Sequence, residues 1–178
     1  MKTILRLKHW QVFLILLLIM LIGNTEIGGQ EDLNIFLSLT GLLLYLTILV
    51  AYGHYLYDYL PRRVELNYNL FIINSFIFAV VVIAATTLFG PEGLHLTGLY
   101  ALPIFYVFYA AYYTLAFPAR VLKSIELNRN VEFGEYLVLA IGFIFWPFTI
   151  WFIQPRVNKI VAYGQIQPDE KQTIVNNN

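Results

Sequence analysis

Four long apolar runs separated by short polar breaks constrain this sequence more than any other feature. They cover residues 10–23, 33–59, 69–89 and 98–117. A helix needs about 20 apolar residues to cross the ~30 Å hydrocarbon core of a bilayer, and most of the runs approach or exceed this length. Only 12% of the 178 residues are charged, about half the fraction found in soluble domains. The sequence therefore predicts an all-α integral membrane protein with four transmembrane helices.

The distribution of basic residues predicts the orientation of these helices. Lys and Arg accumulate on the cytoplasmic side of membrane proteins. If the N-terminal segment is cytoplasmic, the loops at residues 24–32 and 90–97 are external, and they contain no Lys or Arg. The basic residues then fall inside, in three groups: Lys2, Arg6 and Lys8; Arg62 and Arg63; and Arg120, Lys123 and Arg129.

A fifth apolar segment, residues 137–153, leaves two topologies open. If it crosses the bilayer, eight of the eleven basic residues are cytoplasmic; if it enters and returns, all eleven are. Pro147 lies near its midpoint and removes a backbone donor there, and Gly142 loosens the first half. We expect a re-entrant hairpin packed against the other helices, because irregular backbone at that depth needs protein partners. A Pro-kinked fifth span is the alternative.

The segment between the fourth and fifth apolar runs predicts a short amphipathic helix after Pro118. Arg120, Lys123 and Arg129 lie mostly opposite its apolar side chains, and Glu126 is spaced i,i+3 from Arg129. These three cations are candidate contacts for lipid phosphates at the cytoplasmic surface. A solvated connector is the alternative. The expected division is a four-span bundle (1–117), the amphipathic helix with the re-entrant segment (118–162) and a disordered tail (163–178).

Two stretches near the C-terminal end carry a resemblance to known sequences. They are EFGEY at residues 132–136 and WFIQPRVNKI at residues 151–160. This ending resembles those of small uncharacterised bacterial multi-pass membrane proteins. The resemblance covers about a sixth of the chain and implies a bacterial inner-membrane location. It implies no activity.

One polar cluster near the inner end of the second run is a candidate site. His54, Asp58 and Arg62 follow i, i+4, i+8 spacing, so they share a face if the helix continues through them. An ionisable residue inside a membrane span indicates a candidate functional site, for example one for proton relay or metal binding. The alternative is an interfacial anchor in which Asp58 pairs with Arg62 or reaches water.

The chain also contains 13 tyrosines, several of them deep in the predicted spans. Buried hydroxyls need hydrogen-bond partners. The deep tyrosines are expected either to line a polar seam or to bond between helices: Tyr45, Tyr52, Tyr106 and Tyr109.

Several classes of function lack their usual signals. There is no cysteine, Gly-rich phosphate loop, metalloprotease motif or nucleophile elbow. We therefore expect a non-enzymatic scaffold or accessory subunit that has no cofactor. Its expected partners are anionic lipid and either further copies of itself or a membrane complex. No association with nucleic acid is expected. A small homo-oligomeric channel is the first alternative, and a cytoplasmic-face lipid enzyme is the second.

Overall fold

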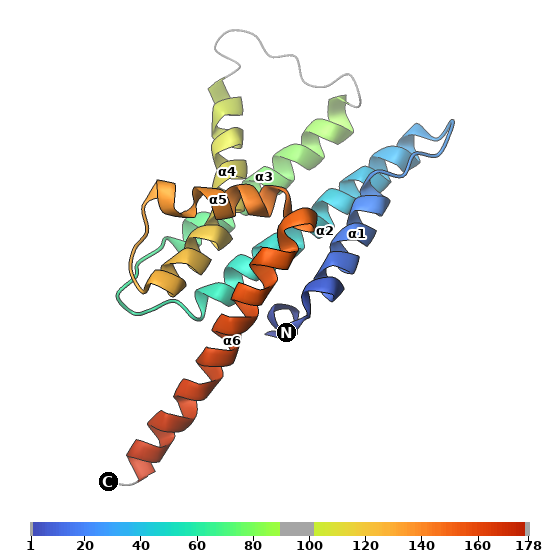
Figure 1. Cartoon of the computed structure of the whole chain (residues 1–178). Helices are drawn as coiled ribbons and strands as arrows, with labels where there is room; N and C mark the ends of the chain where they lie inside the picture. The colour runs from blue at the N-terminus through green and yellow to red at the C-terminus, as the bar shows by residue number, and fades with distance from the viewer. Residues whose placement is uncertain (1, 90–101, 177–178) are drawn as a thin grey trace.

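The computed structural model describes residues 2–89 and 102–176, and throughout these ranges the regular structure is helical (Figure 1). A short 3-10 helix, η1 (Lys2–Arg6), precedes six α-helices. These are α1 (His9–Gly23), α2 (Glu31–Tyr57), α3 (Tyr68–Phe89), α4 (Leu102–Leu127), α5 (Phe133–Ile144) and α6 (Trp146–Asn176). The all-α prediction is thus confirmed for the described residues. The turn expected near Pro91 and the expected start of the fourth run at Gly98 lie outside them.

By length and composition, two helices of the described residues could span a membrane, so four spans are not confirmed. Helix α2 and the segment Tyr68–Leu88 of α3 are long and apolar enough to cross a membrane. Helices α1 and α5 are apolar but shorter, with 15 and 12 residues, or about 22 and 18 Å of helix. Helix α4 has 26 residues, and its last turns contain Arg120, Lys123 and Glu126, whereas Arg129 lies beyond its end.

Helices α1 and α2 form a close antiparallel hairpin (Figure 1). Its turn includes Gly29 at φ 75°, a left-handed conformation that glycine adopts without strain. The two helices meet at a pair of glycines, and a Cβ added to Gly41 would lie 2.5 Å from the Cα of Gly23. No larger residue fits at Gly41 unless the helices separate.

Helix α4 continues through Pro118, so the boundary expected at residues 117–118 falls inside one helix. A proline inside a helix removes one hydrogen bond and costs about 3 kcal/mol. The flanking residues Phe117, Ala119 and Val121 are all buried, and this burial offsets the loss. The helix ends at Leu127, after which Asn128 adopts a left-handed φ of 53°.

Residues 137–153 do not form one helix. Helix α5 ends at Ile144, and α6 begins at Trp146, so that Pro147 occupies the first turn of α6, where a missing donor is tolerated. The two helices bend sharply at Phe145 (Figure 1), and α6 then runs beside α1 and η1. A Cβ added to Gly142 would make ordinary van der Waals contacts with Ile153 at 3.4 Å and Thr149 at 3.7 Å, so the packing of α5 on α6 does not require a glycine there.

Helix α6 also differs from the sequence expectation at its far end. Residues 163–176 belong to this helix, whereas the sequence predicts a disordered tail. Extending an existing helix requires no new nucleation. The Gln, Glu and Lys residues of this stretch have good helix propensity, whereas Gly164 and Pro168 oppose the helix.

Candidate functional site

The polar cluster expected on one face of α2 is not formed as predicted. Helix α2 ends at Tyr57, so Arg62 lies beyond it in the following loop and cannot share a helical face with His54. The Nδ1 atom of His54 lies 2.6 Å from the Tyr68 hydroxyl, which links α2 to the start of α3. Across residues 2–89 and 102–176, no group of three His, Asp or Glu side chains is arranged to hold a metal ion.

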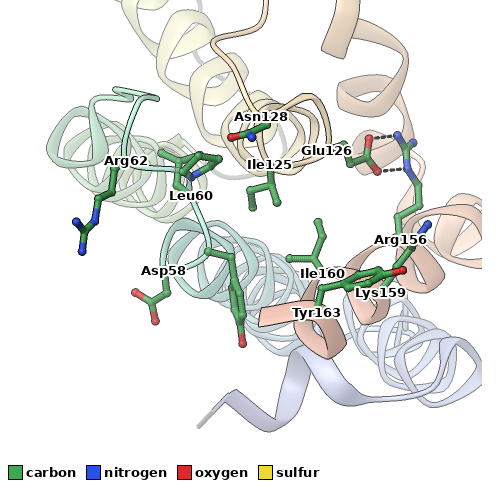
Figure 2. Close-up of a pocket in the computed structure, with 12 residues that line it drawn as sticks. Asp58, Leu60, Arg62, Ile125, Glu126, Asn128, Arg156, Lys159, Ile160 and Tyr163 are labelled. Atoms are coloured by element: carbon green, nitrogen blue, oxygen red, sulfur yellow. Dashed lines mark hydrogen bonds and ion pairs between the residues drawn. The ribbon is translucent and has the colours of Figure 1, made fainter. Parts of the chain in front are cut away.

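Asp58 and Arg62 instead lie at the edge of a cavity of about 1040 Å³ (Figure 2). Its walls come from three segments far apart in the sequence: the loop after α2, the end of α4 and the middle of α6. The lining residues are Asp58, Tyr59, Leu60, Pro61, Arg62, Ile125, Glu126, Asn128, Arg156, Lys159, Ile160 and Tyr163.

One wall of this cavity is fixed by an ion pair between α4 and α6. Arg156 meets Glu126 through two hydrogen bonds, one from Nε to Oε1 at 2.6 Å and one from Nη2 to Oε2. A forked pair of this kind fixes orientation as well as distance. The partner of Glu126 is therefore on α6, not at Arg129 as the i,i+3 spacing suggested, because the helix ends between Glu126 and Arg129.

Arg129 has a different local role at the start of α5. Its guanidinium donates to both carboxylate oxygens of Glu135, at 3.0 and 2.5 Å. Glu135 also accepts the backbone N–H of Glu132. The hydrogen bonds from Arg129, followed by the one from Glu132, lower the pKa of Glu135 below its ordinary value, and the same pair raises the pKa of Arg129.

The other two cations expected at the lipid surface lie further back on α4. Arg120 is half-buried, and its Nε atom is buried without a hydrogen-bond partner in the part of the chain that the structure describes. Lys123 is half-buried as well. Of the three cations predicted to contact lipid phosphates, Arg129 is already paired with Glu135.

Sequence reasoning missed the most highly connected polar side chain, Gln154. It is fully buried, and its Oε1 accepts the Tyr52 hydroxyl at 2.5 Å. Its Nε2 donates to the carbonyls of Leu5 and Leu7, at 3.2 and 2.8 Å, and to Asn158. This one amide joins α6 to α2 and to the N-terminal segment. Its sequence signal is a lone amide at the end of the apolar run of residues 137–153.

The bend between α5 and α6 has its own hydrogen-bond partners. The end of α5 leaves carbonyls without intrahelical donors. The Thr149 hydroxyl donates to the Gly142 carbonyl at 2.5 Å, and the Tyr45 hydroxyl donates to the Phe143 carbonyl at 2.5 Å. Phe145 supplies the Ile141 carbonyl with its N–H. Side chains from α6 and α2 thus satisfy the backbone that the bend exposes.

Three of the four deep tyrosines form hydrogen bonds between helices, as the sequence predicts. Tyr45 and Tyr52 donate to Phe143 and Gln154, and Tyr106 donates to Asn74 on α3 at 3.1 Å. No hydrogen bond of the Tyr109 hydroxyl is found within the described ranges, and its ring packs between those of Tyr106 and Tyr113.

Chemically, the arrangement offers two distinct features. The first is a polar network that fixes helices to one another, and the second is an amphipathic cavity with basic residues at its edge. No protein-family model, curated protein or solved structure matches this chain.

Proposed function

We propose that this chain is a non-enzymatic membrane scaffold or accessory subunit of a bacterial inner membrane. It has four spans, α1 to α4, and a re-entrant hairpin formed by α5 and the first half of α6. Its N-terminal segment and the second half of α6 lie in the cytoplasm. The observation that carries this proposal is the use of buried polar side chains as links between helices at the bend and at Gln154.

The orientation of α6 is supported by its contacts with the N-terminal segment. Gln154 bonds to the carbonyls on both sides of Arg6, and the ring of Trp151 packs on that of His9 at 4.6 Å. These contacts keep α6 beside a segment that contains three basic residues. Such a segment is expected on the cytoplasmic side.

The same orientation is supported by the charged residues around the cavity. Arg156 pairs with Glu126 near the end of α4, and Lys159 lines the same cavity as Arg62. The basic residues of α6 therefore share one end of the bundle with those of the α2–α3 loop. A fifth crossing would require them to lie at the opposite membrane surface.

The depth of the bend in the membrane also supports a re-entrant hairpin over a fifth crossing. Tyr45, which bonds to Phe143, lies twelve residues before the end of α2 at Tyr57, or about 18 Å of helix. If Tyr57 marks the inner membrane surface, the bend is near the middle of a ~30 Å core. One face of the bend packs inward through Phe143, Trp146 and Ile150, whereas Ile144 and Phe148 are exposed and would contact lipid.

A scaffold role is supported by the hydrogen bonding of the buried polar side chains. Asn74, Ser75, Thr114 and Gln154 are all buried, and each is hydrogen-bonded. Outward-facing side chains of α3 and α4 include exposed aromatics such as Phe76, Phe105 and Phe108. These surfaces suit lipid or the helices of a partner.

Reconstitution into liposomes tests this role against its alternatives. The purified protein should form a defined oligomer or complex, and liposomes that contain it should stay as ion-tight as protein-free liposomes. Ion flux that increases with the amount of protein would contradict the scaffold role and favour a channel. Turnover of the liposome lipid would favour an enzyme.

A further inference from the structure

The cavity between α2, α4 and α6 combines charge and apolar surface in a way that no helix-packing role requires. Figure 2 shows the side chains of Ile125 and Ile160 directed into the space, with Leu60 beside them. The charged residues are arranged around this apolar floor. A cavity of about 1040 Å³ is at the upper end of the range for small-ligand sites.

The charge around the floor is positive on balance. Three cations and two carboxylates line the cavity, and Glu126 is neutralised by Arg156. Figure 2 shows the carboxylate of Asp58 directed away from Ile125 and Ile160. The Arg62 guanidinium is also directed away from Ile125 and Ile160 in Figure 2. Arg62 and Lys159 are exposed, so their long side chains are free to turn towards an anion at the mouth of the cavity.

The position of the cavity selects the kind of anion. Its walls are the ends of α2 and α4 and the middle of α6, where the proposed topology has the cytoplasmic lipid headgroups. A free phosphate ion would contact the cations and leave the apolar floor in water. An amphiphile covers both, because its phosphate meets the cations while its glycerol and first methylenes cover the floor.

We propose that this cavity binds the headgroup of one anionic phospholipid, with Arg62 and Lys159 as its cationic contacts. The inference rests on the proposed membrane topology, and the site is separate from the candidate phosphate contacts at Arg120 and Lys123. Arg156 and Glu126 hold the α6 wall against α4, so that the cavity is formed before the lipid arrives. Bound lipid would stabilise the junction of three segments that are distant in the sequence.

The test is a titration of the detergent-solubilised protein with short-chain lipids, followed by native mass spectrometry. Dioctanoyl phosphatidylglycerol should bind saturably at one per protomer and about tenfold more tightly than dioctanoyl phosphatidylcholine. Both lipids carry a phosphate, but the net negative charge of phosphatidylglycerol is attracted by the cations of the cavity, whereas the choline ammonium cancels that charge in phosphatidylcholine. Inorganic phosphate at equal concentration should not displace it. Equal affinity for the two lipids, or displacement by phosphate, would overturn the proposal.

Two kinds of variant locate the site. Arg62→Gln and Lys159→Gln should each weaken phosphatidylglycerol binding several-fold, whereas the matched variant Arg63→Gln, at a neighbouring exposed residue outside the cavity, should not. Ile125→Asp places a carboxylate on the apolar floor beside the expected phosphate position and should weaken binding by at least as much, whereas Ile125→Trp changes the floor without changing the charge and should weaken binding less. If Arg63→Gln weakens binding as much as Arg62→Gln, or Ile125→Asp leaves binding intact, the lipid is held by general surface charge.

This experiment tests the lipid site independently of the proposed function. It uses the isolated protein without a partner, so a failure to bind phosphatidylglycerol leaves the scaffold role untouched. Ion flux in liposomes would remove the scaffold role without affecting the measured lipid affinity.

Discussion

Two fully buried amides, Gln154 on α6 and Asn74 on α3, are used in different ways. Gln154 joins three elements through bonds to Tyr52, to Asn158 and to two carbonyls of the N-terminal segment. Asn74 donates to the carbonyl of Leu70 in its own helix and accepts one bond from Tyr106. One region of the molecule is held by long-range polar bonds, and the other is held mainly by packing.

The packing in the second region is aromatic. The rings of Phe71 and Phe117 stack at 4.1 Å between α3 and α4, and Tyr68 and Tyr113 lie against Phe117. Of the polar residues here, Ser75 and Thr114 bond mainly within their own helices. The difference between the regions indicates where loss of a polar group should matter most, because an orphaned buried partner costs more than a lost local bond.

The largest effect is expected from Gln154→Leu. The change removes the partner of the Tyr52 hydroxyl and the side-chain donor to the Leu5 carbonyl, whereas the Leu7 carbonyl keeps its bond from Asn158. Each unsatisfied buried group costs about 1–3 kcal/mol. We expect a loss of about 2–4 kcal/mol in unfolding free energy in detergent micelles. Asn74→Leu is the matched control and should cost about 1 kcal/mol or less. Equal losses for the two variants would remove the distinction between the regions.

A second, smaller difference in unfolding free energy is expected between variants of two threonines, one at the bend and one inside α2. Thr149→Val removes the hydroxyl that satisfies the Gly142 carbonyl, and we expect a loss of about 1–2 kcal/mol in the same assay. Thr47→Val removes a hydroxyl that bonds to Leu43 inside an intact helix, and its effect should stay within about 0.5 kcal/mol. A Thr149→Val protein as stable as the Thr47→Val protein would mean that the bend does not need this hydroxyl.

The smallest effect concerns the exposed pair of Arg129 and Glu135 at the start of α5. Because the pKa of Glu135 is lowered on folding, its contribution to stability is present above its unfolded pKa and is lost as the pH falls through the folded value. The melting temperature of the native protein should therefore fall slightly more than that of Glu135→Gln as the pH drops below about 4. The difference should shrink in high salt. Parallel pH profiles would contradict a role for this pair.

Helices α1, α2 and α3 could be predicted from the sequence to within a few residues, whereas α4 continues past the predicted run and α6 extends through the predicted tail. The run at residues 69–89 matches α3 (Tyr68–Phe89), and the run at residues 33–59 matches α2 (Glu31–Tyr57). Apolar runs and breakers are local signals, and they decide where a helix can form. Pro118 is the exception, because burial around it outweighs a local cost that the sequence does show.

The contacts of the candidate site could not be predicted in the same way. The bond between Gln154 and Leu5 joins residues 149 positions apart, and no local pattern identifies such partners. The candidate cluster around His54 failed for a related reason, since i,i+4 spacing has meaning only while the helix continues. Pro147 did identify the position of the bend, because it acts on the backbone where it stands, whereas Gly142 lies inside α5.

In the proposed topology, α5 enters the membrane from the cytoplasm and the second half of α6 returns to that same side. The chain has no cysteine, so single cysteine probes can be introduced without background. Glu65→Cys in the α2–α3 loop is the cytoplasmic reference, Gln30→Cys before α2 is the external reference, and Gln167→Cys is the test. Each is treated with a membrane-impermeant maleimide in intact cells and again after the cells are opened. We predict that Gln167→Cys behaves like Glu65→Cys and is labelled only in opened cells; labelling in intact cells, as for Gln30→Cys, would show that the segment crosses the membrane.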